Sequence, residues 1–120
     1  MDKTFLLLGA VAAFLAVTLG AFGAHGLRGR LSPEMMAVFQ TGVQYHMAHA
    51  LALILVSAIM GRMSGWLIQT AGWSFVAGIV LFSGSLYALA ISGVSILGAV
   101  TPIGGLAFLI GWACLAFAAF

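Results

Sequence analysis

The chain has 120 residues, of which 64% are hydrophobic and only 5% are charged, and its mean hydropathy is +1.25. This composition excludes a soluble globular protein, whose surface needs far more polar side chains. The net charge of +2 comes from four basic and two acidic residues, too few to form the basic face that nucleic-acid binding requires. We therefore expect an integral membrane protein without a nucleic-acid partner.

The charged residues separate long apolar stretches. In chain order they are Asp2, Lys3, Arg28, Arg30, Glu34 and Arg62. An α-helix needs about 20 apolar residues to cross a hydrocarbon core of ~30 Å, so four crossings nearly fill the chain. The sequence predicts an all-α fold, a single transmembrane domain over residues 1–120 with four helices at roughly 4–24, 33–60, 66–91 and 101–120.

The first two predicted helices differ in how they begin. The uncharged run 4–24 is longer than the apolar core of a secretory signal, so we expect it to be retained as a helix. Before the second helix, Ser32 can cap free backbone N–H groups and Pro33 suits the first turn. A helix over 33–60 would be roughly 42 Å long, which exceeds the hydrocarbon thickness and requires a tilt, a kink or an interfacial end.

The third and fourth predicted helices are bounded by tryptophans, glycine and proline. Trp66 and Trp73 are expected interfacial anchors at the start of the third helix, and Gly93 is expected to end it. Thr101-Pro102 opens the fourth helix. Small residues recur four apart, as in the pairs Gly9 and Ala13, Ala16 and Gly20, and Ala107 and Gly111, which predicts close packing of the helix backbones.

Four crossings place both termini on one side of the membrane. Lys3 and Arg62 are expected on that side, and Arg28 and Arg30 on the other. The positive-inside rule is therefore tied between the two sides, and only the charged α-amino group favours cytoplasmic termini. We expect a bacterial inner membrane location.

Most polar side chains are expected at the membrane face shared by the end of the first helix, the start of the second, the end of the third and the start of the fourth. The candidate ligand-binding residues there are His25, Tyr45, His46, His49, Ser83, Ser85 and Tyr87, accompanied by Gln40, Gln44 and Thr101. His46 and His49 project from the same side of the second predicted helix. We expect His49 ~9 Å inside the membrane, facing the interior of the bundle.

Three interpretations of the histidines compete. In the first, His25, His46 and His49 hydrogen-bond hydroxyls and backbone carbonyls, closing one end of the bundle. In the second, the same three imidazoles bind a metal ion or haem, although two histidines three residues apart on one helix cannot be opposite axial ligands of one haem. In the third, they handle protons or bind a small polar ligand.

The remaining motifs indicate no catalysis. Ser83-Gly84-Ser85 lacks the glycine spacing of a nucleophile elbow, and we assign no catalytic residue and no cofactor. Arg28 and Arg30 are candidate contacts for anionic lipid headgroups. Cys114 is the single cysteine, so it cannot form an internal disulfide, and we expect it to be a small buried side chain.

Four separated motifs resemble one family. They are GAFGAHGL at 20–27, FQTGVQYHMAHALAL at 39–53, FSGSLY at 82–87, and TPIGG at 101–105 followed by Gly111-Trp112. In these motifs the chain resembles the domain of unknown function 423 family, whose eukaryotic relatives are called transmembrane protein 256. The resemblance implies a small membrane protein of four helices, and it implies no activity, substrate or cofactor.

Together these observations predict a non-enzymatic membrane accessory protein, or a binder of a small or lipidic ligand, with membrane lipids as partners. The alternative is a metal- or haem-binding redox or carrier protein that uses His25, His46 and His49. A third function is an oligomeric transporter or channel, because a chain this short needs several copies to enclose a pathway. A homo-oligomer or a membrane-protein partner is compatible with each of these functions.

Overall fold

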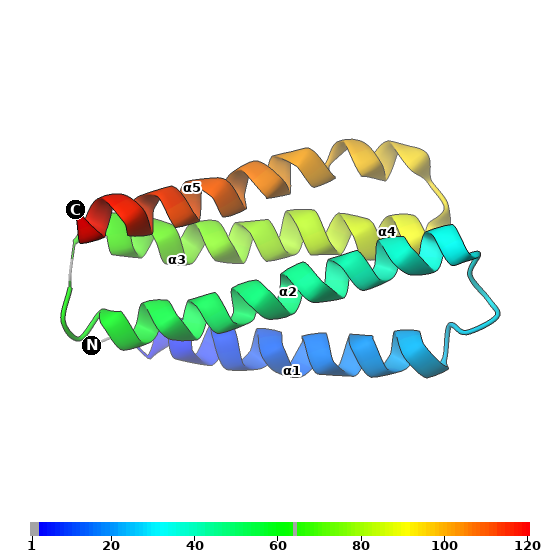
Figure 1. Ribbon diagram of the computed structural model, residues 1–120, viewed down its shortest axis with the longest axis horizontal. Helices are drawn as coiled ribbons and strands as arrows, with labels where there is room; N and C mark the ends of the chain where they lie inside the picture. Colours follow the sequence, from blue (N-terminus) through cyan, green and yellow to red (C-terminus); the bar gives the residue numbers. More distant parts are fainter. Residues whose placement is uncertain (1–2, 64) are drawn as a thin grey trace.

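The computed structural model describes residues 3–63 and 65–120 as four long helical rods lying side by side (Figure 1). In chain order the elements are α1 (Thr4–His25), α2 (Pro33–Ile59), α3 (Trp66–Gly78), a π-helical segment η1 (Ile79–Ser83), α4 (Gly84–Ser92), a 3-10 segment η2 (Ser95–Ala99) and α5 (Thr101–Ala119). Four of the resulting spans are long and apolar enough to cross a membrane. The predicted all-helical membrane fold is confirmed.

The helix ends follow the expected backbone chemistry. The Ser32 side chain accepts a hydrogen bond from the backbone N–H of Met35 at 3.1 Å, and Pro33 is the first residue of α2. At the end of α4, Gly93 has φ of 73°, a left-handed conformation that glycine adopts without the steric cost of a Cβ atom. These two features start and stop helices where the sequence predicts.

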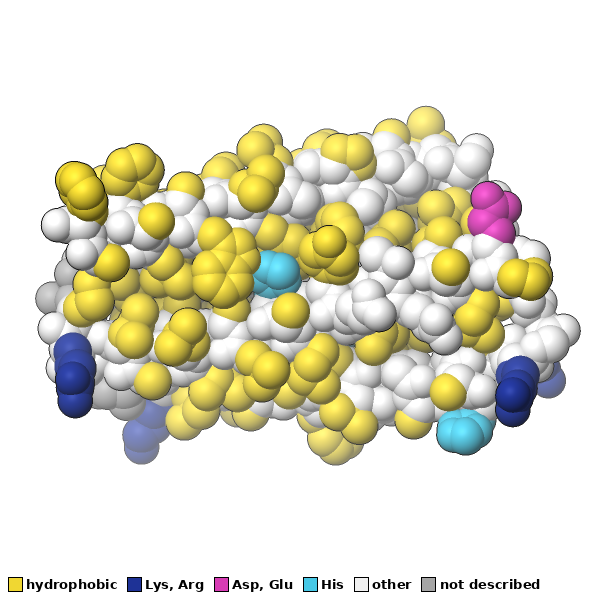
Figure 2. Space-filling model, in the orientation of Figure 1, with side chains coloured by type: hydrophobic (Ala, Val, Ile, Leu, Met, Phe, Trp, Pro, Cys, Tyr) yellow, Lys and Arg dark blue, Asp and Glu magenta, His cyan; other side chains and the backbone are white. Residues whose placement is uncertain are grey.

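The rods alternate in direction, and both ends of the chain lie at the same end of the molecule (Figure 1). The most extensive helix contacts are between α1 and α2 and between α3 and α5, while α2 also contacts α3, η1 and α4. The molecule measures 47 × 25 × 18 Å. In Figure 2 the Lys and Arg side chains lie at the two ends, separated by a largely apolar surface, as expected for a bundle that spans ~30 Å of hydrocarbon.

Close backbone contacts hold the rods together. A Cβ atom added at Gly9 of α1 would lie 2.9 Å from the Ala50 carbonyl oxygen of α2, and one added at Gly111 of α5 would lie 2.5 Å from the Phe75 ring. Both glycines belong to the small-residue pairs of the sequence. They therefore allow the approach of neighbouring helices that this spacing predicts in membranes.

The third rod differs from the uninterrupted helix expected over 66–91. Residues Ile79–Ser83 form a π-helical turn between α3 and α4. The wider turn lies where the buried hydroxyl of Ser83 donates a hydrogen bond to the Gly42 carbonyl of α2, with an oxygen–oxygen distance of 2.7 Å. Such turns are rare inside α-helices and have no strong sequence signature, which is why sequence reasoning did not predict this one.

Candidate functional site

The polar side chains do not gather in one cluster at one end of the bundle. His25 is the exposed last residue of α1. His46 is the central residue of α2, with thirteen helical residues before it (33–45) and thirteen after it (47–59). His46 and His49 therefore lie near the middle of α2, away from His25 at the end of α1, and His49 faces the interior of the bundle as expected, with 5% of its surface exposed.

His46 connects α2 to two other helices. Its side chain is 4% exposed, and its Nδ1 atom lies 2.8 Å from the Tyr87 hydroxyl oxygen of α4. The ring also forms a hydrogen bond to the backbone of Ala12 in α1. The backbone N–H of Ala12 is used within α1, so its carbonyl accepts from the ring, and Tyr87 donates to Nδ1. His46 thus ties three helices together.

His49 uses both ring nitrogens as well. Its Nδ1 atom lies 2.8 Å from the Tyr45 carbonyl oxygen, and the indole N–H of Trp112 donates to its Nε2 atom at 3.0 Å. A carbonyl only accepts and an indole N–H only donates, so these partners specify the neutral imidazole with its proton on Nδ1. The bond to Trp112 joins the middle of α2 to α5.

Aromatic rings surround His49. The Phe108 ring stacks on the imidazole with ring centroids 3.6 Å apart and an interplanar angle of 10°. Phe75 and Trp112 contact the same imidazole with centroid distances of 5.4 and 5.8 Å. Sequence reasoning missed Phe108 and Trp112, although Trp112 lies in one of the quoted motifs and is four residues from Phe108 on α5.

The three histidines do not converge. His25 lies at the end of α1, while His46 and His49 turn toward different helices. Within residues 3–63 and 65–120, no three His, Cys, Asp or Glu side chains are grouped so as to hold a metal ion. The arrangement therefore gives no support to a metal or haem site built from these three residues.

Most hydroxyl groups of the predicted site form hydrogen bonds between helices. Ser83 donates to the Gly42 carbonyl of α2. Ser85 donates to the Phe82 carbonyl, and its hydroxyl oxygen lies 2.6 Å from that of Thr101 in α5. Together with Tyr87, these side chains lock the rods to one another, which leaves them without a free hydroxyl for a ligand.

A crevice with a volume of ≈550 Å³ opens between α2 and α5, and we call it the α2–α5 crevice. Its lining residues are Tyr45, His49, Phe82, Pro102, Gly105, Leu106, Phe108, Leu109 and Trp112. The Tyr45 side chain is 44% exposed there, and its ring lies 4.7 Å from that of Phe82. No described residue forms a hydrogen bond with its hydroxyl group. Of the seven candidate ligand-binding residues, Tyr45 is therefore the one that offers a polar group without a described hydrogen-bond partner inside the spanning region.

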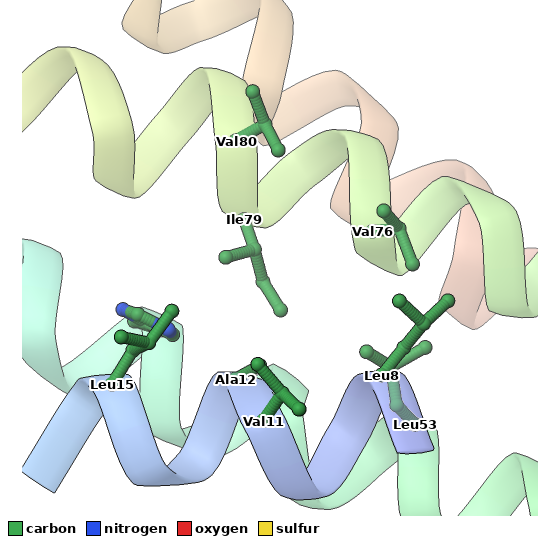
Figure 3. A pocket seen from close by; sticks show the side chains of 9 residues that line it. Leu8, Val11, Ala12, Leu15, Leu53, Val76, Ile79 and Val80 are labelled. Atoms are coloured by element: carbon green, nitrogen blue, oxygen red, sulfur yellow. The ribbon is translucent and has the colours of Figure 1, made fainter. Parts of the chain in front are cut away.

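A second crevice, the α1–α3 crevice, has a volume of ≈210 Å³. It is lined by Leu8, Val11, Ala12, Leu15, His46, Leu53, Val76, Ile79 and Val80. Figure 3 shows Val76 and Ile79 pointing across it toward Leu8 and Val11 of α1. Among the described residues that line it, His46 alone is polar, and its imidazole is already hydrogen-bonded.

Arg28 and Arg30 lie in the connection between α1 and α2, where both are exposed. Figure 2 shows basic side chains and one histidine side chain at this end of the molecule, away from the apolar middle. Guanidinium groups in such a place are accessible to lipid headgroups. They are separate from both crevices.

Comparison with known proteins shows the family. The family model described as protein of unknown function (DUF423) matches residues 19–105. The chain is 55% identical to the UPF0382 membrane protein YwdK of Bacillus subtilis over 98% of this chain and 96% of the relative. It is 48% identical to the UPF0382 membrane protein SH2409 of Staphylococcus haemolyticus, over 98% and 96%, and 50% identical to SERP0230 of Staphylococcus epidermidis, over 97% and 94%. No solved structure matches the chain. This chain belongs to the DUF423 family, and its relatives are bacterial membrane proteins.

Proposed function

We propose that this protein is a non-enzymatic membrane protein that binds a lipid-like ligand in the α2–α5 crevice. The observation that carries the proposal is the Tyr45 hydroxyl, which has no hydrogen-bond partner among the described residues and lies one residue from the middle of α2. An unpaired polar group at such a depth costs free energy because hydrocarbon supplies no partner. A ligand oxygen that accepts from this hydroxyl removes that cost.

The shape and chemistry of the crevice define the ligand class. A volume of ≈550 Å³ falls within the roughly 300–1,000 Å³ of typical small-molecule sites. The walls are apolar and aromatic, with Phe82 and Leu109 among them, so the body of the ligand is apolar. Its polar part is one hydrogen-bond acceptor, such as an ester or ketone carbonyl, placed next to Tyr45.

The hydrogen bonds of the two buried histidines favour binding over catalysis. A general base needs a ring nitrogen free to take a proton from the substrate. In His49 the Nε2 atom already accepts from Trp112, and in His46 the Nδ1 atom is paired with Tyr87. The same pairing supports a structural role for both imidazoles beside the ligand site.

The proposal is tested by identifying the lipids that stay bound after purification from native membranes in mild detergent, using solvent extraction and mass spectrometry. Gly105→Leu is the blocking variant: a Cβ atom there meets only the Phe82 ring, at 3.8 Å or more, and the rest of the leucine side chain occupies space in the crevice that Gly105 lines. Tyr45→Phe removes the free hydroxyl. Tyr87→Phe is the matched control, because it removes the other tyrosine hydroxyl, which lies outside this crevice.

We expect a stoichiometric lipid-like species in the wild-type protein and in Tyr87→Phe. It should be absent from Gly105→Leu and reduced in Tyr45→Phe. The proposal is contradicted if Gly105→Leu retains the same species in the same amount, or if the wild-type protein retains only the bulk lipids of its membrane.

A further inference from the structure

The outward face of α2 differs from an ordinary lipid-facing surface. Its exposed residues include Ala37, Gln40, Gln44, Ala48, Leu51 and Leu55. They repeat every three or four residues and so form one stripe along the helix. The stripe lies opposite the buried side that carries His46 and Leu53. Over the N-terminal half of α2, Figure 2 shows white atoms, which are backbone or side chains neither hydrophobic nor charged, between separate hydrophobic side chains.

The exposed face of α1 provides the contrast. There the outward residues include Leu7, Val11, Phe14 and Val17, which are 49–71% exposed. Mean hydropathy over the most apolar 18-residue window is 2.4 for α1 and 1.4 for α2. Bulky apolar side chains suit contact with lipid tails, whereas small residues and amides are characteristic of contacts between transmembrane helices.

Gln44 is the polar centre of the stripe. It lies two residues before the midpoint of α2, and its side chain is exposed. Neither Gln44 nor Gln40, one turn away, forms a side-chain hydrogen bond with any residue in the part of the chain that the structure describes. An amide that faces hydrocarbon without a partner is costly, and polar groups in membrane spans are normally paired.

We propose that this stripe is the interface of a symmetric dimer in which α2 packs against α2 of a second copy. Two copies with the same orientation in one bilayer are related by a twofold axis along the membrane normal, so each residue meets its own counterpart at the same depth. An amide carries both donors and an acceptor, so two facing Gln44 side chains satisfy each other. A second copy thus supplies complementary groups at the right depth.

The residues beside Gln44 fit the same arrangement. Ala48 lies one turn along the stripe and is small enough for the two helix backbones to approach. Leu51 and Leu55 continue the contact with apolar packing. Tyr45 projects to one side of the stripe, into the α2–α5 crevice, so the dimer and the ligand site are separate and each can fail without the other.

The test is energy transfer between donor- and acceptor-labelled copies reconstituted in phosphatidylcholine vesicles at decreasing protein density. Gln44→Leu should weaken association by about tenfold, the effect of losing roughly 1.4 kcal/mol of hydrogen bonding between helices. Gln69→Leu is the matched control. It makes the same chemical change at an exposed glutamine in the first turn of α3, outside the stripe, and should leave association unchanged.

A second measurement uses cysteine cross-linking in a Cys114→Ala background. Under mild oxidation, Gln44→Cys should form a disulfide-linked dimer, while Phe14→Cys on the exposed face of α1 should not. The proposal is overturned if the wild-type protein shows no density-dependent energy transfer, if Gln44→Leu associates as strongly as the wild type, or if Phe14→Cys cross-links as readily as Gln44→Cys.

Discussion

The two crevices flank α2, and each is lined by one of its histidines. They differ in whether they contain a polar side-chain group without a hydrogen-bond partner among the described residues. In the α1–α3 crevice, His46 is hydrogen-bonded to Tyr87 and Ala12, and the other lining residues are apolar. In the α2–α5 crevice, His49 is similarly hydrogen-bonded, because it accepts from the Trp112 indole N–H. The difference is Tyr45, whose hydroxyl has no partner among the described residues.

This comparison distinguishes polar residues that connect helices from a polar residue that is available to a ligand. Both imidazoles hold helices together, so the presence of a histidine does not distinguish a ligand site from a structural contact in this molecule. A lipid chain alone can fill the apolar α1–α3 crevice. The α2–α5 crevice also contains the Tyr45 hydroxyl, so the ligand site that we propose centres on Tyr45 rather than on the histidines.

The largest expected effect is that of His49→Ala. The change removes the ring stacked on Phe108 and the acceptor of the Trp112 indole N–H, which should lower the free energy of unfolding by about 3 kcal/mol. Denaturant titration in mild detergent micelles measures this. A loss below about 1 kcal/mol would show that the network around His49 contributes little to the fold.

His46→Ala should cost somewhat less, about 2 kcal/mol, because the imidazole has no close ring stacked on it. Its coupling to Tyr87 is measured by a double-mutant cycle with Tyr87→Phe, in which we expect an interaction free energy of about 1 kcal/mol. Strict additivity of the two single changes would contradict the hydrogen bond between them.

Trp112→Phe should lower the free energy of unfolding by about 1 kcal/mol, because it removes the indole donor and keeps an aromatic ring. In a His49→Ala background the same change should have a much smaller effect. An equal loss in both backgrounds would mean that Trp112 acts through packing alone and not through the His49 ring.

Tyr45→Phe should have the smallest effect on stability, within about 0.5 kcal/mol, since its hydroxyl makes no contact that folding depends on. The same variant should lose affinity for the crevice ligand. A destabilisation as large as that of His46→Ala would show that the Tyr45 hydroxyl is part of the structural network, and the contrast between the two crevices would disappear.

The sequence was sufficient for the four spans and for the inward direction of His49, which is 5% exposed, but not for which neighbouring helix each histidine contacts. Apolar length, the Ser32 cap and Gly93 fix where helices begin and end, because these signals act locally. The bond between His49 and Trp112 joins residues 63 apart in the chain, so it depends on how α2 and α5 pack.

The direction of the histidines illustrates the same limit. His46 and His49 are about 60° apart around a helix, which suggested one shared site. Neighbouring helices lie on both sides of this arc, so His46 reaches α1 and α4 while His49 reaches α5. The π-helical turn at Ile79–Ser83 was likewise not predicted from the sequence, because it changes the backbone hydrogen-bond pattern without a distinctive amino-acid composition.

The most direct test of the structural role of the buried histidines is nitrogen NMR of the side chains in labelled protein, recorded in mild detergent before and after addition of Zn²⁺. We expect one neutral form of His49, with its proton on Nδ1 and an Nε2 atom coupled through a hydrogen bond to the Trp112 indole, unchanged by Zn²⁺. A proton on Nε2, or a shift of either nitrogen when the metal is added, would contradict this structural role.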